Sequence, residues 1–101
     1  LAVVLVQNPD IEVLIEGHTD NVPYTGTTIL DNWDLSVKRA TAIVRILQQK
    51  GVKPIQITAA GRSEYIPIQS NSTREGKAKN RRIEIILAPN LDQINKLLGE
   101  E

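Results

Sequence analysis

The sequence contains no cysteine and no phenylalanine, and its aromatic residues are two tyrosines and one tryptophan. Without cysteine the chain forms neither disulfides nor zinc–thiolate sites, although this absence does not fix a compartment, because disulfide-free proteins also occur in oxidising spaces. Since aromatic side chains are scarce, the core must be built from isoleucine, leucine, valine and alanine.

An excess of charge is also lacking, because twelve basic residues balance twelve acidic ones. No overall field therefore attracts nucleic acid or an anionic membrane surface. Apolar runs stay well below the roughly 18 residues that span a bilayer, and the opening "LAVVLVQNPD" has neither a basic leader nor a cleavage-like site. We therefore expect a segment of a longer chain, with any signal or anchor outside it.

What is present is ordinary for a folded domain, with 41% hydrophobic and 24% charged residues over 101 positions. That length allows one core. The apolar stretch 1–8 is either a buried strand or the end of a helix, and we favour the helix. Hydrophobic periodicity and turn residues predict the other elements in order: a strand over 11–17, a helix over 34–50, a strand over 55–60, a short surface helix within 71–80, a strand over 81–87 and a helix in 89–101.

Strands that alternate with helices predict an α/β (α+β) two-layer sandwich, with helices packed on one face of a sheet. The polar stretch 17–33 between the first strand and the central helix has no periodicity, and loops of this length are more often functional than filler. We expect Asn32 or Asp31 to cap the central helix and Gly51 to end it.

The residues give little support to catalysis. His18 is the only histidine, and none of the candidate nucleophiles stands in a Gly-x-Ser-x-Gly elbow. A metal site at His18 and Asp20 lacks a second histidine or a cysteine. We expect no enzyme, no metal and no cofactor, with His18 bonded to nearby backbone. The serines considered as nucleophiles are Ser36, Ser63, Ser70 and Ser72.

A basic run lies in "TREGKAKNRR". Five cations within nine positions could contact phosphates, but the chain is neutral and no aromatic residue lies nearby for stacking. A solvated surface is the favoured interpretation, and we expect no nucleic-acid partner. The five residues are Arg74, Lys77, Lys79, Arg81 and Arg82.

The remaining group is Thr19, Asp20, Asn32 and Arg39. Arg39 lies near the start of the central helix, where the helix dipole disfavours cations, so a role other than helix stability is indicated. A loop carboxylate and this guanidinium can bind the ammonium and the carboxylate of an amino-acid head group. The alternative, that Asp20 and Arg39 pair with each other or cap the helix, stays open from spacing alone.

Three stretches, "GHTDNVP", "NWDLSVKRA" and "NRRIEIIL", resemble the OmpA-like C-terminal domain. This peptidoglycan-binding module also occurs in peptidoglycan-associated lipoproteins and in the flagellar stator B subunit. The resemblance covers roughly residues 1–88 and includes the "LQQKGV" turn. The length of the loop between Asp20 and Asn32, with Pro23 and Trp33, is most similar to the stator B type.

The resemblance implies a mixed sheet with helices on one face, in β/α/β/α/β topology, and noncatalytic binding to the diaminopimelate of a peptidoglycan stem peptide. By position, Asp20 would bind the ammonium and Arg39 the carboxylate. The other residues implied to line the site are Thr19, Asn32, Leu35 and, as a neighbour, Arg82.

Residues 1–88 would form this domain, truncated at its N-terminus, and 89–101 a C-terminal helical extension. The partner implied is peptidoglycan, and the place is the periplasm, at the cell wall. The parent would be anchored in the outer or inner membrane, as a porin, a lipoprotein or a stator, and a homodimer stays open. Two alternatives remain: a protein-interaction domain that docks through residues 74–82, and a cell-wall hydrolase that uses His18 and Asp20.

Overall fold

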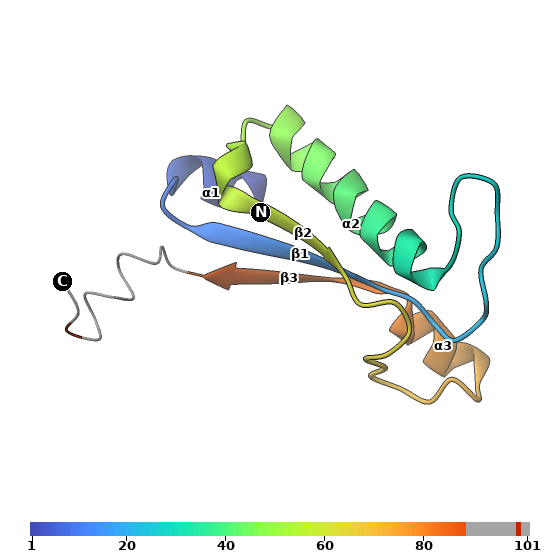
Figure 1. Cartoon of the computed structure of the whole chain (residues 1–101). Coiled ribbons are helices and arrows are strands. Elements are labelled where there is room, and N and C mark those ends of the chain that lie inside the picture. The colour runs from blue at the N-terminus through green and yellow to red at the C-terminus, as the bar shows by residue number, and fades with distance from the viewer. Residues whose placement is uncertain (89–98, 100–101) are drawn as a thin grey trace.

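The computed structural model describes residues 1–88 and residue 99, and it contains three helices, one 3₁₀ turn and three strands within them. Figure 1 shows the strands as one sheet with α1 and α2 above it. The predicted extension 89–101 lies, apart from residue 99, outside the described residues. In chain order the elements are α1 (Ala2–Gln7), β1 (Glu12–His18), α2 (Asn32–Gln49), η1 (Pro54–Gln56), β2 (Ile57–Gly61), α3 (Arg74–Asn80) and β3 (Arg82–Ala88).

The sheet is mixed, in the order β2-β1-β3. β1 is parallel to β2, pairing Val13 with Ile57, and antiparallel to β3, pairing Ile15 with Ile85. Because β1 lies at the centre, both of its edges are hydrogen-bonded. The chain therefore follows the β/α/β/α/β path, and the expected mixed sheet is confirmed.

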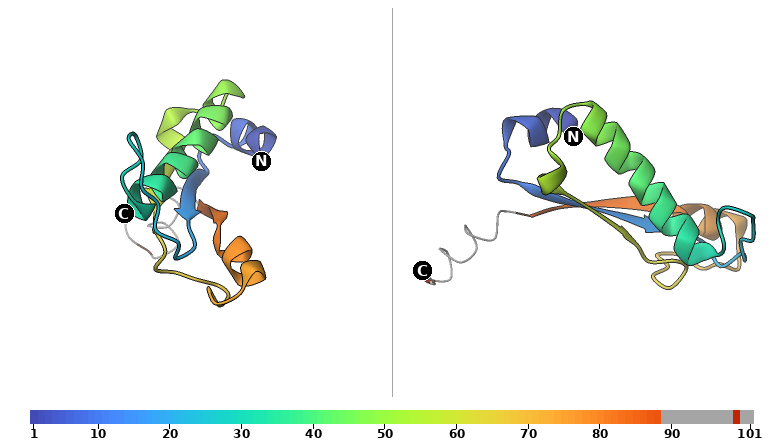
Figure 2. Two further views of the ribbon diagram at one scale, coloured as in Figure 1. Left: turned by 90° about the vertical axis from the view of Figure 1, so that its right-hand side faces the viewer. Right: turned by 45° about the horizontal axis from the view of Figure 1, so that its top comes forward.

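The core lies between this sheet and the two helices α1 and α2, which both lie over the same face (Figure 2). Val13 and Ile15 of β1 point to that face, since side chains alternate along a strand. They pack with Leu5 of α1 and with Ala40 and Leu47 of α2, and all five are at most 5% exposed. The expected aliphatic core is confirmed for these residues.

Helix α2 begins two residues before the predicted start. Asp31 is its N-cap, and its side chain accepts a hydrogen bond from the Asp34 N–H. Of the two caps proposed from sequence, Asp31 is therefore the one used. Gly51 follows the helix with a φ of +98°, a conformation that favours glycine and ends the helix as expected.

The start of α2 packs tightly against the sheet at two glycines. A Cβ added to Gly17 of β1 would overlap the Ser36 carbonyl oxygen, and one added to Gly61 of β2 would overlap the Ser36 and Val37 side chains. The Ser36 hydroxyl also accepts the Ser63 N–H at 3.1 Å. These contacts hold the first turns of α2 over the end of the sheet where β1 and β2 finish.

Several segments gather at that end. Figure 1 shows the loop before α2, the segment after β2 and the helix α3 all near the end of β1. α3 leads directly into β3, which starts with Arg82 opposite His18, the last residue of β1. Residues distant in sequence are thus brought to one place.

Candidate functional site

Thr19 and Asp20 follow directly after β1, and their backbone is fixed by hydrogen bonds. The Thr19 N–H donates to the Ser63 carbonyl oxygen at 2.9 Å. This bond continues the pairing of β1 and β2 into the residues that follow both strands. The Thr19 hydroxyl donates to the Asp20 carbonyl oxygen at 2.8 Å. Thr19 is 4% exposed and serves here to position Asp20.

Both oxygens of the Asp20 carboxylate have a protein partner. Oδ1 accepts the Val22 N–H at 3.0 Å, and Oδ2 accepts Nη1 of Arg81 at 2.6 Å. The Asp20 side chain is 10% exposed, whereas that of Arg81 is 47% exposed. A ligand that approaches Asp20 must therefore displace Arg81 or share Oδ2 with it.

Arg39 comes to the same strand end from α2. Its Nη1 donates to the His18 carbonyl oxygen at 3.2 Å, and His18 precedes Thr19 directly. In residues 1–88 the ion pair of Asp20 is with Arg81, so Asp20 and Arg39 do not pair with each other. This excludes the alternative of an Asp20–Arg39 ion pair. Asp20 and the contact of Arg39 both lie at the end of β1.

Asn32 connects the loop to this strand end. Its Nδ2 donates to the carbonyl oxygens of Val22 at 3.0 Å and of Asp20 at 3.4 Å. The residue is 6% exposed, and Leu35, one turn further along α2, is half-buried. The structure thus brings Thr19, Asp20, Asn32 and Arg39 together, and we call these four residues the head-group site.

Arg82 lies at the same strand end, opposite His18, but its guanidinium contacts partners other than Asp20. Its guanidinium bonds Glu84 at 2.6 Å, the Ile66 carbonyl oxygen at 2.9 Å and the Asn80 carbonyl oxygen at 3.3 Å. The neighbouring Arg81 is the arginine that contacts Asp20. Sequence reasoning named Arg82 as the neighbour of the site and missed Arg81. The Asn-Arg-Arg motif signals an arginine here but does not say which one faces Asp20.

Arg81 and Arg82 are thus engaged with two different acids, Asp20 and Glu84. Their charges are partly neutralised, so the basic run over 74–82 does not act as one free cationic face. This placement weakens the alternative of docking through that run.

His18 belongs to a separate network on the sheet face opposite the core. Its Nε2 lies 2.8 Å from Oε1 of Glu16 and 3.7 Å from Oε2 of Glu84, and the residue is 0% exposed. Nδ1 has no partner among the described atoms, which favours the tautomer with the proton on Nε2.

Glu16, His18 and Glu84 form the one group in the described residues whose ligand atoms would suit a metal ion, all within 4.8 Å. Each carboxylate already faces a guanidinium, however: Arg62 lies 3.5 Å from Glu16, and Arg82 lies 2.6 Å from Glu84. Two negative and two positive charges balance, so this group is an ion-pair network around a buried histidine.

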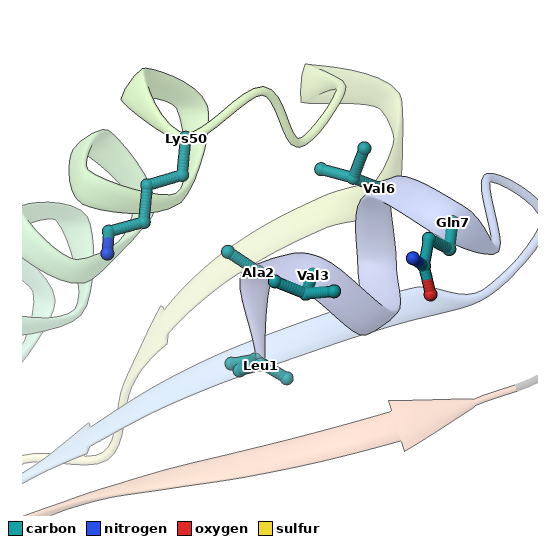
Figure 3. Close-up of a pocket in the computed structure, with 6 residues that line it drawn as sticks. All are labelled: Leu1, Ala2, Val3, Val6, Gln7 and Lys50. Atoms are coloured by element: carbon teal, nitrogen blue, oxygen red, sulfur yellow. The ribbon is translucent and has the colours of Figure 1, made fainter.

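Two hollows lie away from the head-group site. The larger, of about 530 Å³, lies between α1 and the end of α2, and Figure 3 shows its lining. Its residues are Leu1, Ala2, Val3, Val6, Gln7 and Lys50. A second, of about 280 Å³, lies on the open sheet face around Leu14 and Ile86. No acidic side chain lines the first hollow, so it lacks the pairing of an acid with a base that the head-group site has.

A third hollow adjoins the head-group site through Asn32. It measures about 270 Å³, and Trp33 and Tyr65 form an aromatic pair there with ring centroids 5.4 Å apart. We call it the aromatic pocket. Its lining residues are Pro23, Tyr24, Thr25, Leu30, Asp31, Asn32, Trp33, Ser63, Glu64 and Tyr65.

The geometry can be set beside known proteins. The model of the OmpA family matches residues 1–81. The chain belongs to the OmpA family. The resemblance drawn from the three sequence motifs is thereby confirmed.

Among curated relatives, motility protein B of Bacillus subtilis is 41% identical over 86 residues, which cover 84% of this chain and 33% of the relative. The peptidoglycan-binding protein ArfA of Mycobacterium tuberculosis is 42% identical over 79 residues, covering 78% of this chain and 23% of the relative. The chain thus spans a third or less of these relatives. Neither name is that of an enzyme, and the matched family indicates no enzyme class.

Among solved structures, the periplasmic domain of Helicobacter pylori MotB superposes with a TM-score of 0.82 at 25% identity. The match covers 97% of this chain and 63% of that one. The α+β fold is therefore that of a periplasmic domain of a MotB protein. Within the part of this chain that the structure describes, no helix combines the length and the apolar character that a bilayer crossing needs.

Proposed function

We propose that this chain binds peptidoglycan without catalysis, through the diaminopimelate of a stem peptide, and so anchors a larger envelope protein to the cell wall. The observation that supports the proposal is that Asp20 lies two residues after the end of β1, while Arg39 bonds the carbonyl oxygen of His18, the last residue of that strand. A carboxylate suits the ligand ammonium, and a planar guanidinium suits its carboxylate. The name of the ArfA relative, a peptidoglycan-binding protein, supports the same assignment.

Geometry near the start of α2 fits a zwitterion. Arg39 is the eighth residue of α2, beyond the first turn in which the helix dipole acts, so a ligand carboxylate beside it would be held by the guanidinium itself. Arg39 in turn is held by the His18 carbonyl oxygen, which leaves other N–H groups of its fork for a ligand.

The proposal places residues 1–88 as the binding module and 89–101 as an extension of it. The domain would work in the periplasm, where the similar MotB domain of known structure belongs. The parent chain would be anchored in the inner or outer membrane outside this segment. The hydrolase alternative receives no support, because the His18 ring is fully buried and its Nε2 faces Glu16.

The test is cosedimentation with purified sacculi. Asp20→Ala and Arg39→Ala each remove one charge-assisted contact, worth about 1.5–3 kcal/mol. The affinity for sacculi should therefore fall by roughly 10- to 150-fold. Arg45→Ala is the matched control, since Arg45 lies exposed further along the same helix. It should cosediment as the native chain does.

Thermal melting of each variant separates lost binding from lost folding. If Asp20→Ala and Arg39→Ala are folded and still cosediment like the native chain, the assigned site is wrong.

A further inference from the structure

All three aromatic residues of the chain line one hollow. Tyr24 comes from the loop before α2, Trp33 from the first turn of α2 and Tyr65 from the segment after β2. They are 41%, 50% and 62% exposed, so they are not core residues. Large aromatic surfaces left in water at one place favour a binding role.

Two residues that line the aromatic pocket, Ser63 and Asn32, are held by hydrogen bonds. Ser63 is 2% exposed, with its N–H bonded to the Ser36 hydroxyl and its carbonyl oxygen to the Thr19 N–H. Asn32 is held by two carbonyl oxygens of the loop. The rings of Trp33 and Tyr65, inclined by 39°, contact each other at this pocket.

Charge and size indicate the occupant. Asp31 and Glu64 line the pocket and no lysine or arginine does, which disfavours phosphates and other anions. The Thr25 hydroxyl can donate or accept, and Oδ1 of Asn32 can accept, since Nδ2 already donates to two carbonyl oxygens, so the lining suits a ring that carries hydroxyl and amide groups. A volume of about 270 Å³ lies below the roughly 300 Å³ at which pockets for whole small molecules begin, so it suits one ring.

We propose that the aromatic pocket binds one N-acetylated pyranose ring of the glycan strand, next to the stem peptide held by the head-group site. The apolar C–H face of the ring stacks on Trp33 and Tyr65, and its hydroxyl and acetamido groups face the polar lining. Asn32 lines both sites, so a sugar and the peptide attached to it can bind together. This inference rests on the proposed function.

The experiment compares two ligands on the same protein: a disaccharide–tripeptide muropeptide that contains diaminopimelate, and the same tripeptide without sugars. The muropeptide should bind roughly threefold to tenfold more tightly, the range expected for one aromatic stacking contact. Trp33→Ala and Tyr65→Ala should remove that gain and leave tripeptide affinity unchanged. Ile55→Ala is the control, because Ile55 is 85% exposed and lies outside the pocket.

Trp33 is the only tryptophan, so its fluorescence reports the pocket directly. The muropeptide should change its emission, and the tripeptide should not. A change with the tripeptide alone would assign the pocket to a peptide side chain and overturn the inference. Equal affinities for both ligands would also overturn it while leaving the proposed function intact, whereas binding of neither ligand would overturn both.

Discussion

Arg81 is the ion-pair partner of Asp20, so it would compete with the proposed ligand of that carboxylate. It is half-exposed and holds Oδ2 of Asp20 at 2.6 Å. An exposed ion pair of this kind contributes about 0.2–1 kcal/mol. If a ligand ammonium binds Asp20 as proposed, it competes with this pair, and Arg81→Gln should raise the affinity for free diaminopimelate by up to about fivefold. The measurement is an NMR titration of the native and variant chains.

Arg62→Gln is the matched control for the loss of one charge. Arg62 is 53% exposed and faces Glu16, outside the head-group site. Arg62→Gln should leave the affinity for free diaminopimelate unchanged. Weaker binding by Arg81→Gln would contradict the competition and make Arg81 a contact of the ligand carboxylate.

Sequence reasoning named Asp20 and Arg39 for the head-group site, but it did not predict that Asp20 forms its ion pair with Arg81. The resemblance of the motifs that contain Asp20 and Arg39 to the OmpA-like domain implied that these two residues share one site. Arg81 and Arg82 are adjacent, and their side chains point in different directions. Arg81 contacts Asp20, whereas Arg82 contacts Glu84. Which one faces Asp20 depends on where α3 ends and β3 begins, and element boundaries depend on tertiary contacts that a sequence pattern does not contain.

Among the elements, η1 differs most from the prediction. The sequence predicted a strand over 55–60, but Pro54–Gln56 form a 3₁₀ turn and the strand begins at Ile57. Gln56 explains the difference, because its Nε2 donates to the carbonyl oxygens of Leu5, Asn8 and Ile11 at 3.0–3.1 Å. Gln56 is 3% exposed and ties the end of α1 and the start of β1 to η1.

Removing this amide should destabilise the fold. Gln56→Met keeps a side chain of similar length but donates no hydrogen bond. The carbonyl oxygens of Leu5, Asn8 and Ile11 therefore lose the amide, and those of Leu5 and Asn8 keep only a backbone donor. The free energy of unfolding should fall by about 1–3 kcal/mol. Urea denaturation should show a lower midpoint with an unchanged slope.

Gln48→Met is the matched control for replacing a glutamine by methionine, since Gln48 lies exposed near the end of α2. It should change the unfolding free energy by less than about 0.5 kcal/mol. Equal stability of both variants would show that the Gln56 contacts contribute nothing net.

Elements with strong periodicity were predicted well, and those set by long-range contacts were not. Helix α2 and strands β1 and β3 follow from apolar spacing and lie within two residues of the expected bounds. The 3₁₀ turn depends on carbonyl oxygens more than 40 residues away in sequence, which no local pattern encodes. The aromatic pocket likewise joins Trp33 to Tyr65 across two elements, so it was not predicted.

The whole molecule is electrically neutral, so its attachment to a wall polymer must come from local contacts. Under the proposed function, two charge-assisted contacts, reduced by desolvation and ordering costs, would give micromolar to millimolar affinity for one stem peptide. The chain spans 33% or less of the length of the two curated relatives described above. Firm anchoring would then depend on several modules that engage one polymer together.

Two copies joined by a flexible linker test this dependence. Because the second binding event becomes intramolecular, the tandem protein should bind sacculi about 100-fold or more tightly than the single chain. A tandem with Asp20→Ala in one copy has the same mass and linker but one working site, so it should return to the affinity of the single chain. If this control bound as tightly as the unaltered tandem, wall attachment would come from surfaces other than the head-group site.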